Sequence, residues 1–215
     1  MKKFIEEIEA YVTKRGSNAP VMVALTGKMR SGKTTLANRF RVKYMLDSHS
    51  PSAYKAVDVS SFGGAMKTAM KDIFYGSPIY DEGKKPRQAI IDFAQGCRKI
   101  DKDVWVRHTL RHILFTVRDT AVEYIIIDDL RQPNEYKALK DIGFKFIKIE
   151  ADDSRRLERV KKLGDVGSEE NLNDETERYI DTFDVDYVIN NDGDSNDAYK
   201  EFERILKELK EGVTQ

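Results

Sequence analysis

The chain has 215 residues, of which 37 are Lys or Arg and 37 are Asp or Glu, so its formal net charge is zero. This balance excludes a global basic field for nucleic acid or an anionic membrane, so a bound polyanion requires a local cluster of cations. The longest apolar runs have the length of strands, and no signal-type apolar segment opens the chain, so we expect a cytoplasmic protein that is not in a membrane. Cys97 is the lone cysteine, which excludes an intramolecular disulfide. One domain, residues 1–215, is the expected organisation, since no Pro/Gly/Ser-rich linker divides it.

Alternating strands and helices are predicted along the chain. A first helix, with apolar residues on one face between Phe4 and Val12, belongs to an N-terminal extension of residues 1–20. Strands follow at residues 21–25, 54–59, 124–127, 144–149 and 187–189. Further helices are predicted at residues 35–44, about 64–74, 87–98, 103–117, 134–142, 155–163 and 199–209, with exposed or polar loops at 76–85 and 164–173.

This order predicts a three-layer α/β/α fold, in which a parallel sheet carries helices on both faces. Ligands of such sheets bind beyond the carboxyl ends of the strands. We expect Gly27, Asp58, Asp128 and Asn190 to meet at that edge, although they are far apart in the sequence.

Residues 27–34 fit the phosphate-binding pattern G-x-x-x-x-G-K-[ST] and follow the buried strand of residues 21–25. Only glycine lets successive backbone N–H groups curl closely around phosphate oxygens, and the helix after the loop directs its positive end at them. In this motif the lysine reaches the β and γ phosphates and the hydroxyl binds Mg²⁺. We therefore expect ATP to bind at Gly27, Lys28, Met29, Arg30, Ser31, Gly32, Lys33, Thr34 and Thr35.

Two acidic residues, Asp128 and Asp129, come after the apolar run of residues 124–127. A carboxylate at this sheet edge is what a Walker B position requires, because it holds the Mg²⁺ shell near the transferring phosphoryl group. Such an ending also serves as a turn or cap in many proteins. Arg131 follows two residues later and is placed to clamp an anion at the same edge. The metal ligands expected from the sequence are thus Thr34 and one or both of Asp128 and Asp129.

Residues 126–135 resemble the D-x-R segment of phage-type deoxynucleoside monophosphate kinases, which belong to the P-loop nucleoside monophosphate kinase superfamily. Residues 185–194 are similar to the closing strand and turn of that family and of dephospho-coenzyme A kinases. Residues 64–67 and 103–106 resemble its middle segments more loosely. The family pattern favours Asp129 as the metal-side carboxylate, whereas the apolar run alone favours Asp128. The resemblance implies that Arg131 and one or both of Arg87 and Arg98 bind the acceptor monophosphate, with Lys67 nearby. Trp105 has two interpretations, a wall of the base pocket or a residue of the core, since a single tryptophan at helical spacing is often buried.

Arginines on moving parts are expected as well, because phosphoryl transfer requires charge neutralisation and exclusion of water. Arg155, Arg156 and Arg159 begin a helix that leads into the polar segment 164–173, so residues 152–178 are predicted to form a small lid. Arg155 and Arg159 share a helical face and are the favoured catalytic pair. The alternative is a solvated face on which these arginines pair with acidic neighbours.

Together these features predict a kinase that uses ATP and Mg²⁺ to phosphorylate the 5′-phosphate of a deoxynucleoside monophosphate. Lys33, Asp129, Arg131, Arg155 and Arg159 are its expected catalytic residues. Two alternatives stay open: a P-loop kinase for another acceptor, either a coenzyme precursor or a hydroxymethylated base in DNA, and a non-kinase nucleotide-binding switch. Small nucleotides are the expected partners; long nucleic acid is disfavoured by the charge balance, and a homodimer stays open.

Overall fold

The computed structural model describes residues 1–48, 56–80, 87–162 and 177–213. The polar segment 164–173, which the sequence assigns to the lid, therefore lies outside the described residues. Residues 81–85 of the predicted loop 76–85 also lie outside them.

Five strands of the described chain form one parallel sheet in the order β2-β3-β1-β4-β5. Every residue of the central strand β1 is buried, because strands flank it on both sides and helices cover both faces. The bounds of the strands are β1 Val21–Thr26, β2 Val57–Ser60, β3 Tyr124–Leu130, β4 Lys145–Glu150 and β5 Tyr187–Asn190.

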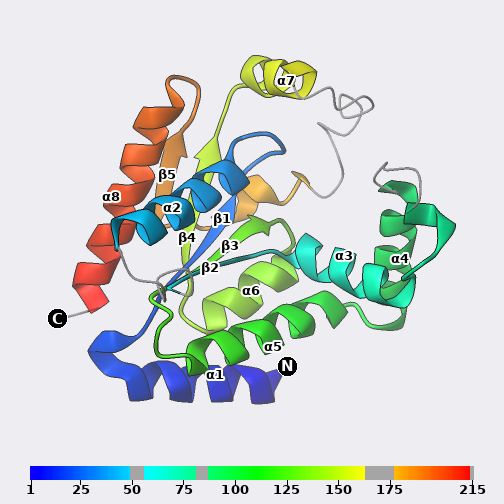
Figure 1. The fold of residues 1–215 in the computed structure, drawn as a ribbon, viewed down its shortest axis with the longest axis horizontal. Coiled ribbons are helices and arrows are strands. Elements are labelled where there is room, and N and C mark those ends of the chain that lie inside the picture. Colours follow the sequence, from blue (N-terminus) through cyan, green and yellow to red (C-terminus); the bar gives the residue numbers. More distant parts are fainter. Residues whose placement is uncertain (49–55, 81–86, 163–176, 214–215) are drawn as a thin grey trace.

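Helices cover both faces of this sheet, as Figure 1 shows. Successive isoleucines of β3 alternate between the two faces: Ile125 and Ile127 join one apolar cluster and Ile126 joins the other. The first face carries α1 Lys2–Arg15, α5 Val104–Arg118 and α6 Pro133–Asp141, and the second carries α2 Lys33–Asp47 and α8 Ser195–Val213. The predicted three-layer α/β fold of P-loop kinases is confirmed.

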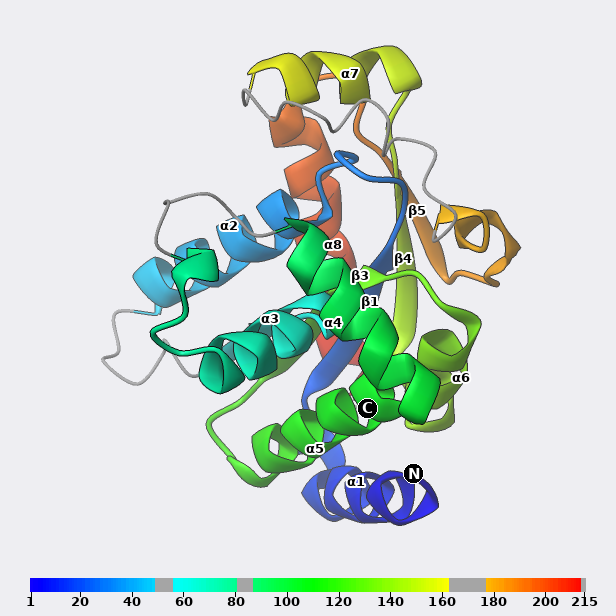
Figure 2. The same ribbon diagram turned by 90° about the vertical axis from the view of Figure 1, so that its right-hand side faces the viewer.

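Three further helices frame the edge at which the strands end. The pair α3 Phe62–Ile73 and α4 Arg87–Ile100 stands beside the sheet, while α7 Asp153–Lys162 lies beyond the carboxyl end of β4. Figure 2 shows α7 and α1 at opposite ends of the molecule. The described residues also form short 3₁₀ helices: η1 Gly16–Asn18, η3 Pro78–Tyr80 and η6 Ile180–Thr182.

The N-terminal helix α1 packs into the core. Ile8 is fully buried in the same cluster as Ile113 and Val117 of α5. At the end of α1, the Arg15 guanidinium donates to the carbonyl oxygens of Asp119 at 3.0 Å and Val122 at 2.6 Å. The segment predicted as an extension thus packs against α5 and anchors the loop between α5 and β3.

None of the helices within the described ranges combines the length and apolar character that crossing a membrane requires.

The prediction that Asp58 lies at the carboxyl edge is wrong. Strand β2 begins at Val57, so Asp58 pairs in register with Ile125, the second residue of β3, and stands near the start of the sheet. Its carboxylate lies 3.0 Å from Nε2 of His112 on α5. The hydrogen bond to Asp58 raises the pKa of His112, because it stabilises the protonated ring.

This raised pKa predicts a pH-dependent contribution to stability. The protonated pair stabilises the fold fully below about pH 6.5, the pKa of an unperturbed histidine, and the effect is lost as the pH rises through the higher pKa of the folded state. A half-exposed pair of this kind is worth up to about 1 kcal/mol, or about 2–4 °C in melting temperature for a chain of this size. We expect His112→Gln to lower the melting temperature at pH 6 by more than at pH 8.5. An equal shift at both pH values would contradict the assignment.

Candidate phosphate-binding site

The loop of residues 27–32 connects β1 to α2 at the carboxyl edge of the sheet. Gly27 and Gly32 have φ angles of +134° and +109°, a region that residues with a Cβ atom rarely adopt. A Cβ atom on Gly27 would collide with the carbonyl oxygen of Ile149 in β4, and one on Gly32 would collide with the side-chain amide of Asn191. Both glycines of the motif are therefore required by conformation and by space.

The motif lysine, Lys33, is the first residue of α2 and only 7% exposed. Its ammonium group donates to the carbonyl oxygens of Gly27 at 2.5 Å and Lys28 at 2.9 Å, so it spans the hollow of the loop. Burial, together with the nearby charge of Arg131, lowers the pKa of Lys33 to about 8. Thr34 and Thr35 follow in the first turn of the helix, and both are exposed.

Asn191, which follows β5, holds the loop from behind. Its side-chain amide donates to the carbonyl oxygen of Ser31 at 2.7 Å, while its own Oδ1 atom is buried without a hydrogen-bond partner among the described residues. The sequence resemblance includes Asn191 in its closing segment but gives it no role. The contact explains why the turn after β5 lies against the loop.

Arg159 of α7 contacts the same part of the loop. Its guanidinium donates to the carbonyl oxygens of Arg30 at 3.0 Å, Ser31 at 3.1 Å and Asn191 at 2.6 Å. Burial lowers the pKa of Arg159. The predicted arginine of the lid helix is thus brought to the loop, with its hydrogen bonds made to backbone oxygens.

The three arginines of α7 differ in their surroundings. Arg155, predicted to act with Arg159, is half-exposed and pairs with Glu158 at 3.2 Å, which is the solvated alternative considered above. Arg156, which the spacing does not favour, is 1% exposed and donates to the carbonyl oxygen of Met29 at 3.3 Å. The structure therefore brings Arg156 and Arg159 to the loop and leaves Arg155 in an ion pair on its own helix.

The acidic residues of β3 have different partners. Between two paired positions, Ala24↔Ile127 and Thr26↔Leu130, β3 contains one residue more than β1, so a bulge interrupts its alternation at Asp128 and Asp129. Asp129 accepts hydrogen bonds from the backbone N–H groups of Phe62 and Gly63, both at 2.7 Å. Burial raises the pKa of Asp129, against the opposing effect of these two bonds. Asp129 therefore caps α3 at its first turn.

Asp128 is 6% exposed, and no residue within the described ranges donates a hydrogen bond to its carboxylate. Asp128 is thus the carboxylate of this edge that is available to a metal shell, whereas both oxygens of Asp129 are engaged.

Arg131 leaves the end of β3 in a turn fixed by Glu135. The Glu135 carboxylate accepts hydrogen bonds from the backbone N–H groups of Arg131 at 3.1 Å and Gln132 at 3.0 Å. Burial, and then the nearby charge of Asp129, raise the pKa of Glu135 to about 7. The Arg131 guanidinium lies 3.6 Å from the carboxylate of Glu177. Nη1 of Arg156 on α7 lies 3.5 Å from the same carboxylate, so the arginine that follows β3 and one from α7 converge on Glu177 beside the loop.

The residues predicted for the acceptor lie on α3, α4 and α5. Lys67 is exposed on α3, and Nη2 of Arg98 on α4 lies 3.8 Å from the sulfur of Met66. Arg87 begins α4, and its side chain is not among those described. Trp105 is 4% exposed and donates its indole N–H to the carbonyl oxygen of Ala94 at 3.3 Å. Trp105 packs in the core between α4 and α5, which is the second of the two interpretations given above.

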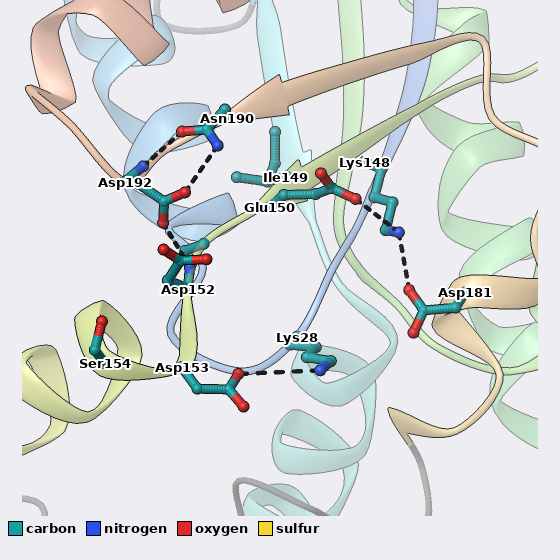
Figure 3. Close-up of a pocket in the computed structure, with 11 residues that line it drawn as sticks. Lys28, Lys148, Ile149, Glu150, Asp152, Asp153, Ser154, Asp181, Asn190 and Asp192 are labelled. Atoms are coloured by element: carbon teal, nitrogen blue, oxygen red, sulfur yellow. Dashed lines mark hydrogen bonds and ion pairs between the residues drawn. The ribbon is translucent and has the colours of Figure 1, made fainter.

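A separate cavity lies beside the loop, at the ends of β4 and β5 (Figure 3). Lys28 points toward Asp153, 4.0 Å away, and Lys148 lies between Glu150 and Asp181. Acidic side chains dominate its lining: Glu150, Asp152, Asp153, Asp181 and Asp192. Carboxylates repel phosphate groups and accept hydrogen bonds, so this cavity suits hydroxyl and amine groups of a ligand.

A family model described as "AAA domain" matches residues 23–179, which include the loop, β3 and α7. The chain belongs to this family. No curated protein matches the sequence.

Several solved structures align with this chain. The crystal structure of TT1252 from Thermus thermophilus aligns with a TM-score of 0.52 and 18% identity over 88% of this chain and 98% of that one. Shikimate kinase from Bacteroides thetaiotaomicron aligns with a TM-score of 0.49 and 15% identity, over 87% and 98% of the two chains. Thymidylate kinase from Ehrlichia chaffeensis aligns with a TM-score of 0.42 and 14% identity, over 87% and 98%. The likeness to TT1252 supports the arrangement of sheet and helices described above.

The collision of a Gly27 side chain with the Ile149 carbonyl gives a test of the loop geometry. We expect Gly27→Ala to lower the free energy of unfolding by about 2 kcal/mol or more, because a left-handed alanine and a backbone clash add together. Gly96 in α4 has open space around it, and Gly96→Ala is expected to stabilise the protein by about 0.5–1 kcal/mol. Urea unfolding measures both variants. Equal effects of the two substitutions would contradict the described loop.

Proposed function

We propose that the protein transfers the γ-phosphoryl group of ATP, with Mg²⁺, to the 5′-phosphate of a deoxynucleoside monophosphate. The observation that carries this proposal is the convergence of Lys33, Arg131 and Arg156 on one anionic position beside the glycine loop. Three cations from three separate elements around one such position are what a polyphosphate requires.

The residues present fit a nucleotide triphosphate. Gly27 and Gly32 let the loop follow a path that a Cβ atom would block, and the backbone N–H of Met29 already donates to a carboxylate. In the proposed complex the loop N–H groups and Lys33 bind the β and γ phosphates. Thr34 and Asp128 would hold Mg²⁺, which neutralises charge on the phosphoryl oxygens. The acidic cavity of Figure 3 would take the hydroxyl-bearing and amine-bearing part of the donor.

On the acceptor side, we propose that Arg98 and Lys67 bind the monophosphate together with Arg131. Arg98 and Lys67 come from α4 and α3, and Asp129 ties the start of α3 to the end of β3. Arg131 leaves that same strand end, so the two sides of the site share one rigid support. A guanidinium suits this task because its planar fork binds two phosphate oxygens at once.

Two alternatives share parts of this account. A kinase for a coenzyme precursor or for a base in DNA would keep the donor residues and change the acceptor. A nucleotide-binding switch would usually receive an arginine from a partner, whereas this chain places Arg156 and Arg159 at its own loop. That observation favours the kinase over the switch.

Assaying ATP against deoxy- and ribonucleoside monophosphates, with product masses as the readout, tests the proposal. We expect a diphosphate from at least one deoxynucleotide and no turnover by Lys33→Ala, because that variant lacks the cation in the loop. A matched melting curve would show that the variant is folded. Diphosphate formation from none of the deoxynucleotides would contradict the acceptor, and ATP hydrolysis that no small acceptor accelerates would favour the switch.

The two aspartates of β3 should respond differently to the same change. We expect Asp128→Asn to raise the Mg²⁺ concentration for half-maximal activity about tenfold or more, since it removes a charged ligand. Asp129→Asn should leave that concentration near the wild-type value and cost about 1–2 kcal/mol of stability through the lost cap. Amide hydrogen exchange should then accelerate at Phe62 and Gly63. A shifted Mg²⁺ requirement in Asp129→Asn alone would reverse the two assignments.

A further inference from the structure

The carboxylate of Glu177 lies against the phosphate-binding loop. Its side chain is 5% exposed, and Oε1 accepts a hydrogen bond from the backbone N–H of Met29 at 2.5 Å. The two carboxylate oxygens lie 3.6 Å from Nη1 of Arg131 and 3.5 Å from Nη1 of Arg156. Glu177 thus brings together a loop amide and two arginines that come from different parts of the fold.

This set of partners is the chemistry of phosphate recognition. A backbone N–H in a glycine-containing loop and two guanidinium groups are donors that suit a dianion with several oxygens. A single carboxylate matches them incompletely: Oε2 of Glu177 is buried and accepts no hydrogen bond within the described part of the chain. A phosphate group offers one more oxygen and greater negative charge to the same donors.

We propose that the Glu177 carboxylate occupies a phosphate subsite in the nucleotide-free protein and is displaced when a polyphosphate binds. The subsite consists of the Met29 N–H, Arg131 and Arg156, and its ligand class is the phosphate chain of a nucleotide or inorganic pyrophosphate. The inference rests on the donor half of the proposed function and adds Glu177 as an internal competitor for the loop.

Charge explains why such a competitor is useful. Three cations lie near one another in a partly buried region: Lys33, Arg131 and Arg156. The nearby charge of Arg131 already lowers the pKa of Lys33. The carboxylate offsets this repulsion while no ligand is bound, and Glu177 also acts to raise the pKa of Lys33. Because Glu177 is tethered in the same chain, its effective concentration at the loop is high, so a ligand must bind tightly enough to replace it. Displacement would release Arg131, the arginine shared with the acceptor side, from its ion pair with Glu177.

A purely structural ion pair predicts a different outcome. If Glu177 only held α7 and β3 together, its removal would weaken the fold and would leave the affinity for phosphate ligands unchanged or reduced. A competitor predicts the opposite change in affinity, because the subsite is vacated in advance.

Isothermal titration with ATP, and separately with inorganic pyrophosphate, distinguishes these cases. We expect Glu177→Gln to lower the Kd of both ligands about five- to tenfold. Glu177→Asp keeps the charge but shortens the side chain, so for each ligand its Kd should lie between those of the wild type and of Glu177→Gln. Glu203→Gln is the matched control, because Glu203 also pairs with two lysines, Lys43 and Lys207, but on α8 and without contact to the loop. Its Kd should equal that of the wild type.

The outcomes separate this inference from the proposed function. Measurable binding with the same or a higher Kd in the Glu177 variants would overturn the inference and leave the kinase proposal intact. Binding of neither ligand to any form, the wild type included, would overturn the donor site and the inference with it. Should Glu177→Gln fail to fold in a melting experiment, Glu177→Asp decides alone, since it keeps a negative charge beside Arg131 and Arg156.

Discussion

The close approach of the loop to the ends of β4 and β5 determines the site. Gly27 lies against the Ile149 carbonyl, and Gly32 lies against Asn191, so the path of the backbone leaves no room for side chains at either point. The loop is consequently shaped by the sheet edge and by the turn after β5 as much as by its own sequence. Lys33 and the start of α2 follow from that path, because the helix begins directly at the second glycine.

Around this loop the protein arranges cations from several elements and offsets them with a few acids. Arg131 directly follows β3, and Arg156 and Arg159 come from α7. Asp129 serves the architecture by capping α3, and Glu135 fixes the turn that carries Arg131. These two carboxylates orient the groups that would contact phosphate, which is how a rigid scaffold positions reactive side chains.

The sequence predicted the order of elements and the loop because both depend on local patterns: apolar periodicity and a short motif of glycines and lysine. It could not predict Glu177, Arg156 or Asn191, whose roles arise from contacts between segments far apart in the chain. The bulge in β3 breaks the alternation that would have told Asp128 from Asp129. Trp105 had two interpretations, a core residue or a wall of a pocket, and Arg155 had two, a surface ion pair or a contact to the ligand. The sequence does not decide between them, because each depends on how the side chain packs in the folded protein. The roles of the acceptor residues stay predictions.

The most direct test of the central claim is a crystal structure with Mg²⁺ and a non-hydrolysable ATP analogue. We expect phosphate oxygens on the Met29 N–H and on Lys33, with Arg131 and Arg156 turned to the phosphate chain and the Glu177 carboxylate displaced from the loop. An analogue bound elsewhere, with the Glu177 carboxylate still against the loop, would contradict the proposed site.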